Sequence, residues 1–269
     1  MHVDSNGVRI HVEDQGTGAP ALVFLHYWGG SSRTWNAVVD ALPITCRIVR
    51  PDLRGWGSSV TMPSSDGPVG YNLSDYAADV AAVVSALELD NYVLIGHSMG
   101  GKIAQLLASQ RPSGLAGLVL VAPAPPGALQ MPEEAKAAMA SAYVSEASVG
   151  LAIEHMLTSR PLSPEQRRQV IEDSLRGTAE AKIAWPQSIS QEDITHQVQA
   201  INVPTVVIAG ERDQVDSVAT LKAHLLPNIP HADFHELAGT GHLSPLESPV
   251  ELAAIIGGFV STLRSKLSA

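Results

Sequence analysis

A serine between two glycines is the first feature of this sequence that could do chemistry. The segment Gly96-His97-Ser98-Met99-Gly100 follows an apolar run over 92–95 and precedes a helical pattern over 102–110. A sharp strand-to-helix turn exposes a serine hydroxyl at the positive end of the helix, where free N–H groups can stabilise an oxyanion. Glycines two residues away on either side let the chain pack without a clashing Cβ. The motif predicts Ser98 as a nucleophile, with a chemically silent glycine-rich turn as the alternative.

A serine hydroxyl needs a base to take its proton, and in this arrangement the acid and then the histidine follow the serine in the chain. His242 ends the loop Ala238-Gly239-Thr240-Gly241-His242, directly after an expected strand over 233–237. A side chain leaving the carboxyl end of a strand can reach over the sheet edge, so we expect His242 to be the base. The remaining downstream histidines are expected on the surface or in packing: His155, His196, His224, His231 and His235.

Asp213 is the expected acid. It follows an expected strand over 206–209 that ends in glycine. From there a carboxylate can accept the Nδ1–H of His242, fix its tautomer and stabilise the imidazolium. Glu211 and Asp216 lie close by and remain alternatives, the first as a solvated charge and the second as a helix cap.

An oxyanion hole should combine the backbone N–H of Met99, the residue after the nucleophile, with one from an earlier strand-to-helix loop. That loop is expected over 25–30. We expect the second donor to be Trp28, with Tyr27 as the alternative. Because the donors are backbone groups, residue type distinguishes them poorly.

Alternating strand and helix patterns must position these residues. They predict a mostly parallel sheet with helices on both faces. Strands are expected over 8–12, 21–25, 47–51, 92–95, 118–121, 206–209 and 233–237, and helices over 73–87, 102–110 and 249–263.

Residues 125–197 interrupt this alternation with helical patterns and no convincing strand. We interpret them as a helical insertion that divides one core domain into residues 1–124 and 198–269. Its large apolar residues either pack in a core or, because Met adapts to irregular shapes, face a substrate cavity. The residues expected to line such a pocket are Trp28, His97, Met131, Met139, Tyr143, Met156 and Trp185.

Taken together, the motifs resemble the α/β-hydrolase superfamily. Phe24-Leu25-His26-Tyr27-Trp28 comes first, followed by Pro51-Asp52-Leu53-Arg54-Gly55-Trp56-Gly57-Ser58-Ser59, the serine motif, Asp213 and Gly241-His242, over residues 7 to 262. The resemblance implies an α/β-hydrolase fold, a mostly parallel eight-stranded sheet flanked by helices, with residues 125–197 as a helical cap.

The resemblance also bears on the oxyanion loop. Many relatives have His-Gly before an aromatic residue, whereas Tyr27 stands in the place of the glycine here. It implies that His26 and Asp52 support this loop, and that Arg54 holds the Asp52 loop by hydrogen bonds. These three are expected to be structural. A serine at position 98 argues against the dehalogenases and epoxide hydrolases of this fold, which use aspartate.

The expected function is therefore cleavage of a small or medium carboxylic ester or lactone through an acyl-enzyme on Ser98. A carbon–carbon bond hydrolase or a cofactor-free perhydrolase would keep the same three residues, and a ligand receptor of this fold is the alternative without turnover. We expect no cofactor and no metal.

Composition limits the partners. The 269 residues carry a formal net charge of −10, which argues against binding to nucleic acid. We expect no membrane span, because no apolar run is long enough, and no signal peptide. The single cysteine, Cys46, excludes an internal disulfide and fits a reducing, cytoplasmic location. The sequence makes no prediction of oligomeric state.

Overall fold

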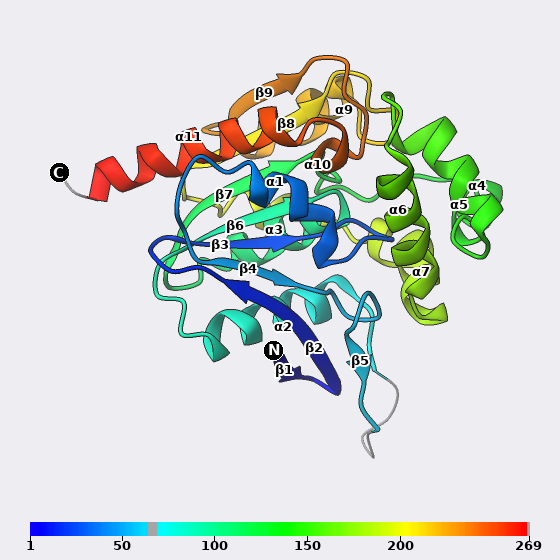
Figure 1. The fold of residues 1–269 in the computed structure, drawn as a ribbon, viewed down its shortest axis with the longest axis horizontal. Coiled ribbons are helices and arrows are strands. Elements are labelled where there is room, and N and C mark those ends of the chain that lie inside the picture. Colours follow the sequence, from blue (N-terminus) through cyan, green and yellow to red (C-terminus); the bar gives the residue numbers. More distant parts are fainter. Residues whose placement is uncertain (64–68, 268–269) are drawn as a thin grey trace.

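A computed structural model describes residues 1–63 and 69–267, and its centre is one twisted sheet (Figure 1). The main spatial order is β1-β2-β4-β3-β6-β7-β8-β9, and β5 pairs with β2. Strands β4, β3, β6, β7, β8 and β9 run parallel, whereas β1, β2 and β5 pair antiparallel. The bounds are β1 (His2–Ser5), β2 (Val8–Gln15), β3 (Ala21–Leu25), β4 (Ile48–Pro51), β5 (Val60–Thr61), β6 (Tyr92–His97), β7 (Leu115–Val121), β8 (Thr205–Gly210) and β9 (Asp233–Leu237).

The prediction of a mostly parallel sheet is confirmed, but the count of strands differs. The described residues form nine strands rather than eight, and two of the nine lie outside the seven ranges expected for strands: β1 and the exposed two-residue β5. So short a segment carries no periodic pattern, because the strand signal is an alternation over four residues or more.

Helices cover both faces of the sheet because its central strands β3, β6, β7 and β8 are apolar on both sides. In β3, Leu22 and Phe24 join a core with α1 and α11, whereas Val23 and Leu25 join a second core with α2 and α3 (Figure 1). Burying each such side chain stabilises the fold by about 1.5–3 kcal/mol before entropy is counted. Outside the segment between β7 and β8, the helices are α1 (Asn36–Asp40), α2 (Leu73–Ala86), α3 (Met99–Ser109), α9 (Val218–His224), α10 (Ser244–Glu247) and α11 (Pro249–Leu267), with short turns η1 (Ser32–Trp35) and η4 (Leu226–Asn228).

The segment between β7 and β8 contains only helices among the described residues. In Figure 1, α4 to α7 lie together beyond the end of the sheet toward which β3 points. We refer to residues 125–197 as the insertion, and their status as a separate domain stays a prediction. Its elements are α4 (Glu133–Ala140), α5 (Glu146–Ala152), the π-helical turn η2 (Ile153–Leu157), α6 (Pro164–Arg176), α7 (Ala179–Gln187), η3 (Ile189–Gln191) and α8 (Thr195–Val198).

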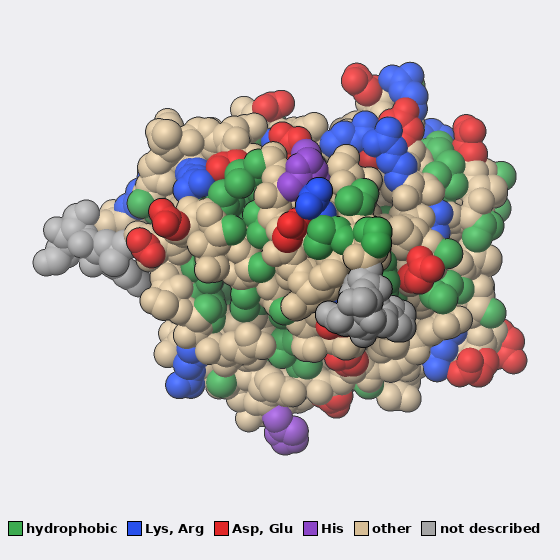
Figure 2. Space-filling view, turned by 90° about the horizontal axis from the view of Figure 1, so that it is seen from below, with side chains coloured by type: hydrophobic (Ala, Val, Ile, Leu, Met, Phe, Trp, Pro, Cys, Tyr) green, Lys and Arg blue, Asp and Glu red, His purple; other side chains and the backbone are tan. Residues whose placement is uncertain are grey.

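Charges of both signs are mixed on one face of the molecule. On the face drawn in Figure 2, Lys and Arg side chains are spread among acidic ones. Within residues 1–63 and 69–267, no helix is both long and apolar enough to cross a membrane.

A buried ion pair joins Arg54 to Asp79. Arg54 donates from Nε and Nη2 to the two carboxylate oxygens of Asp79, at 2.7 and 2.6 Å, and both side chains are almost wholly inaccessible. A third hydrogen bond runs from Arg54 to the carbonyl of Gly70. Arg54 thus ties the loop after β4 to α2 by hydrogen bonds.

Breaking this pair should cost stability. Asp79→Ala leaves the Arg54 charge buried and uncompensated, so we expect the free energy of unfolding to fall by about 3–5 kcal/mol. Urea denaturation followed by circular dichroism measures it. Asp4→Ala is the matched control, because it breaks the exposed Arg9–Asp4 pair and should leave the midpoint unchanged. Equal midpoints for the two variants would contradict the structural role given to Arg54.

Candidate active site

Ser98 occupies the turn between β6 and α3 with a strained backbone. Its φ of 54° and ψ of −116° lie where L-residues are rare, as expected for a side chain held out of a tight strand-to-helix turn. A Cβ on Gly100 would lie 2.5 Å from the carbonyl oxygen of His26, and one on Gly96 would collide with the carbonyl of Gly100. Both glycines are therefore sterically required for this turn.

The structure brings together the three residues expected to act as a unit. Ser98 Oγ lies 2.9 Å from His242 Nε2, and His242 Nδ1 lies 2.8 Å from Asp213 Oδ2. The other Asp213 oxygen accepts the backbone N–H groups of Val215 and Asp216 at 2.8 and 3.0 Å. Because the ionised carboxylate only accepts, neutral His242 carries its proton on Nδ1 and its Nε2 is free to accept from Ser98.

The charges in this chain oppose the cost of burial. Burial lowers the pKa of His242, but the charge and hydrogen bond of Asp213 outweigh it, so the pKa is raised. Burial raises the pKa of the Asp213 carboxyl. His242 and the two backbone N–H donors lower it by more, so the pKa is lowered overall. Asp213 thus stays ionised, and the imidazolium of His242 is stabilised.

The two alternative acids are placed differently. Glu211 accepts the backbone N–H of Gly239 at 2.6 Å from an exposed position. Asp216 makes no hydrogen bond to His242 in the described structure, although it is buried close by. Of the three carboxylates, Asp213 alone is hydrogen-bonded to the imidazole among the described residues.

His97 lies behind His242 rather than in the pocket it was predicted to line. The fully buried ring donates from Nε2 to the backbone carbonyl of His242 at 2.8 Å and packs against Tyr27 and Trp35. Burial and the neighbouring charge of His242 lower the pKa of His97 to about 3. The correction follows from the strand period, because in β6 position 97 points away from the turn and into the core. A neutral His97 holds the His242 loop.

An apolar cavity of about 370 Å³ opens beside Ser98 and His242. Six of the predicted pocket residues line it: Trp28, Met131, Met139, Tyr143, Met156 and Trp185. Ser98 also borders a second cavity, of about 440 Å³, into which Lys102 and Asp216 face. This second cavity has no signal in the sequence, since the pattern at Lys102 indicates only the start of a helix.

Comparisons with known proteins decide the family. A family model described as the alpha/beta hydrolase fold matches residues 20–249. The chain belongs to the α/β-hydrolase family. A non-heme chloroperoxidase of Streptomyces lividans is 32% identical over 83% of this chain and 87% of its own length. A 3-oxoadipate enol-lactonase 2 of Acinetobacter baylyi is 28% identical over 86% and 84%. The solved structure of an esterase from Thermogutta terrifontis has a TM-score of 0.81 and is 26% identical over 98% of both chains.

The candidate oxyanion loop of this α/β-hydrolase is held by the insertion. The Trp28 indole donates to the carbonyl of Ala181 at 3.3 Å, and the Tyr143 hydroxyl donates to the Trp28 carbonyl at 3.1 Å. In the described residues no hydrogen bond engages the backbone N–H of Trp28, Tyr27 or Met99. Trp28 therefore stays the predicted partner of Met99, with Tyr27 the alternative.

Two polar residues brace this loop from the core. His26 donates from Nδ1 to the carbonyl of the next residue at 2.7 Å and accepts the N–H of Leu53 at Nε2, at 2.9 Å. Asp52 accepts the N–H groups of Ser32 and Ser58 at 2.6 and 2.8 Å. Both residues join the loop after β3 to the loop after β4.

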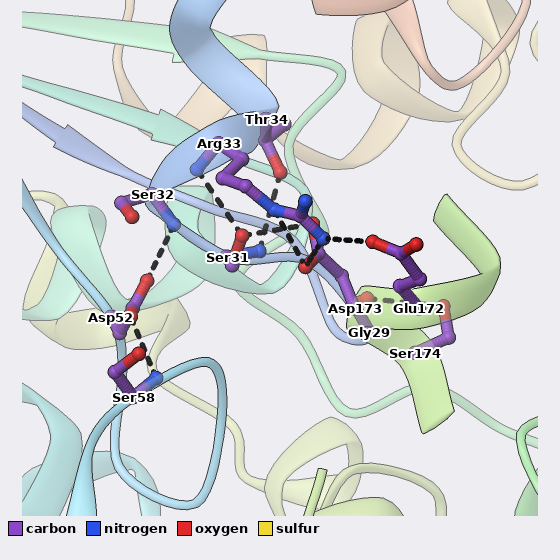
Figure 3. Close-up of polar contacts among 10 residues, drawn as sticks. All are labelled: Gly29, Ser31, Ser32, Arg33, Thr34, Asp52, Ser58, Glu172, Asp173 and Ser174. Atoms are coloured by element: carbon purple, nitrogen blue, oxygen red, sulfur yellow. Dashed lines mark hydrogen bonds and ion pairs between the residues drawn. The ribbon is translucent and has the colours of Figure 1, made fainter. Parts of the chain in front are cut away.

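A third brace comes from α6 in the insertion, as Figure 3 shows. Asp173 accepts the Ser31 hydroxyl at 2.8 Å and the Arg33 guanidinium at 2.6 and 3.1 Å. The Ser174 hydroxyl donates to the carbonyl of Gly29 at 3.0 Å. Because Asp173 and Ser174 are buried, this contact fixes α6 against the candidate oxyanion loop.

Within residues 1–63 and 69–267 no group of three or more His, Cys, Asp or Glu side chains is placed to hold a metal ion.

The pKa values of the two buried histidines should be shifted in opposite directions, that of His242 upward and that of His97 downward. In ¹⁵N-labelled protein we expect the His242 ring to titrate above its ordinary 6.5, because Asp213 stabilises the charged form. His97 should stay neutral to the lowest pH at which the protein is folded. Asp213→Asn removes the negative charge and leaves burial, so the His242 midpoint should fall below 6.5. A His242 midpoint that Asp213→Asn does not lower would contradict the assigned pairing.

Proposed function

We propose that this protein is a serine hydrolase that cleaves a small or medium carboxylic ester or lactone through an acyl-enzyme on Ser98. The observation that carries the proposal is the continuous hydrogen-bonded chain from Ser98 through His242 to Asp213, at the floor of an apolar cavity. The names of two relatives, an enol-lactonase and an esterase, support the same kind of bond cleavage.

In the first half of the reaction, Ser98 Oγ attacks the substrate carbonyl carbon while His242 Nε2 takes the hydroxyl proton. The tetrahedral oxyanion accepts hydrogen bonds from the backbone N–H of Met99 and of Trp28, each worth about 3 kcal/mol in such sites. The ester C–O bond then breaks, and the imidazolium gives its proton to the leaving alkoxide.

In the second half, His242 takes a proton from water as the water attacks the acyl carbonyl. The bond to Ser98 Oγ breaks, the serine regains its proton from His242, and the carboxylic acid leaves. Asp213 stays ionised throughout and orients the ring.

Similarity to a non-heme chloroperoxidase supports a second candidate. In a perhydrolase, hydrogen peroxide rather than water would release the acyl group from Ser98, giving a peracid. The three residues would act as above, so the nucleophile that resolves the acyl-enzyme distinguishes the two. Peracid formation from acetate and peroxide, measured beside ester hydrolysis, tests this candidate.

Removing the nucleophile tests the main proposal. Ser98→Ala should lower kcat for p-nitrophenyl esters by about 10⁶-fold, because attack and proton transfer are both lost. The denaturation midpoint should stay near that of the wild type. Ser109→Ala is the matched control on the same helix, where the hydroxyl bonds only the carbonyl of Leu106.

The substrates assayed beside p-nitrophenyl esters should include lactones, and vinylogous diketones so that carbon–carbon bond hydrolysis is measured too. Most of the wild-type ester activity surviving in purified Ser98→Ala would refute the acyl-enzyme. Tight retention of a ligand with negligible turnover would favour a receptor instead.

A further inference from the structure

Two cavities of different chemistry meet at Ser98. The first is lined by aromatic, Met and Ala side chains around Ser98 and His242. The second, of about 440 Å³, is bordered by Ser98 and has a mixed lining, in which Lys102, Asp216 and other polar side chains lie among apolar ones. Met139, Trp185 and Val215 line both cavities. An ester lying across Ser98 would therefore place one arm in apolar surroundings and the other in a cavity of mixed lining, into which Lys102 and Asp216 face.

Asp216 is the unusual residue of the second cavity. Asp216 is only 7% exposed, and in the described structure its carboxylate accepts no hydrogen bond. Asp213, three positions earlier, accepts three. A buried carboxylate without donors is costly, and burial raises the pKa of Asp216 to about 7. A donor from a bound molecule would relieve that cost.

Lys102 faces the same cavity from α3, one helical turn after Ser98. It is 1% exposed and donates to the carbonyl of Gly127 at 3.0 Å, which uses one of its three N–H bonds. The charges of Lys102 and Asp216 act on each other, but the two side chains form no ion pair in the described residues. Glu192 and Asp193 act more strongly on Lys102, and His242 and Asp213 act more strongly on Asp216. Burial lowers the pKa of Lys102 to about 8.

The opposed charges of Lys102 and Asp216 limit which chemical group of a bound molecule could lie between them. A carboxylate would be attracted by Lys102 but repelled by Asp216, and an ammonium group would meet the reverse. A hydroxyl satisfies both side chains, because it donates its proton to Asp216 and accepts from Lys102. Neighbouring hydroxyls would satisfy both without requiring one oxygen to span the distance.

We propose that the substrate is a hydroxylated ester, whose hydroxyl-bearing arm binds between Lys102 and Asp216 while its other arm occupies the apolar cavity. This inference rests on the proposed function. Lys102 and Asp216 are specificity-determining residues in it, and neither takes part in bond cleavage.

Two matched pairs of esters test the inference on either side of the ester bond. The first pair is 2,3-dihydroxypropyl butyrate and propyl butyrate, and the second is propyl 2,3-dihydroxypropanoate and propyl propanoate. Acid release at constant pH measures kcat/KM for each ester. This value is then divided by the rate of alkaline hydrolysis of the same ester, and the resulting values are compared within each pair. We expect the hydroxylated member of at least one pair to be favoured by about 10-fold or more.

Variants then assign that preference to the two side chains. Asp216→Leu and Lys102→Met should bring the favoured ratio close to one, and Asp216→Asn, which keeps an accepting oxygen, should retain part of it. Because the readout is a ratio, a general loss of rate cancels. Lys222→Met on α9, which removes an exposed lysine paired with Glu236, should leave the ratio unchanged.

The possible outcomes distinguish failure of the hydroxyl subsite from failure of the proposed hydrolase function. Hydrolysis of all four esters with both wild-type ratios near one would overturn the hydroxyl subsite and leave the hydrolase intact. A tenfold ratio that persists in Asp216→Leu and Lys102→Met would overturn the assignment to these residues. Faster cleavage of butyrylcholine or of 3-(butyryloxy)propanoate than of the dihydroxypropyl ester would overturn the choice of hydroxyl. No hydrolysis of any ester would overturn both proposals.

Discussion

The hydrogen bond between Ser98 and His242 joins residues 144 positions apart, and the rest of the fold keeps them in contact. Strands β6, β7, β8 and β9 are consecutive neighbours in the sheet, so the loops at their carboxyl ends share one edge. Asp213 lies in the loop after β8, between the strands that lead to Ser98 and to His242. The parallel order of these strands is thus the physical condition for the site, and the two apolar cores hold that order.

Backbone groups at the site depend on the insertion as much as on the sheet. Trp28 contacts the insertion through both its indole and its carbonyl, and Asp173 holds the following turn through Ser31 and Arg33. Preorganised donors stabilise an oxyanion without reorganising during the reaction. In the account proposed here, the insertion therefore shapes the substrate cavity and also fixes the loop expected to supply one oxyanion donor.

Local signals were enough for much of this architecture. The bounds of β3 and β9 agree with the apolar patterns, and the glycines of the serine motif predict the turn at Ser98 because each excludes a side chain. What depends on tertiary contact was out of reach. Asp213 and Asp216 follow β8 within six residues, and only the course of the turn decides which one meets His242. The hydrogen bond from His97 to the His242 carbonyl has no sequence signal, because it links the end of β6 to the loop after β9, 145 positions away.

Covalent trapping of the nucleophile tests the central claim most directly. A fluorophosphonate should bind one equivalent per protein chain, and peptide mapping by mass spectrometry should find the adduct on Ser98. Asp213→Asn should label more slowly, since His242 then loses its orienting partner. Labelling on another serine, or no labelling of folded protein by a reagent small enough for the 370 Å³ cavity, would contradict the account.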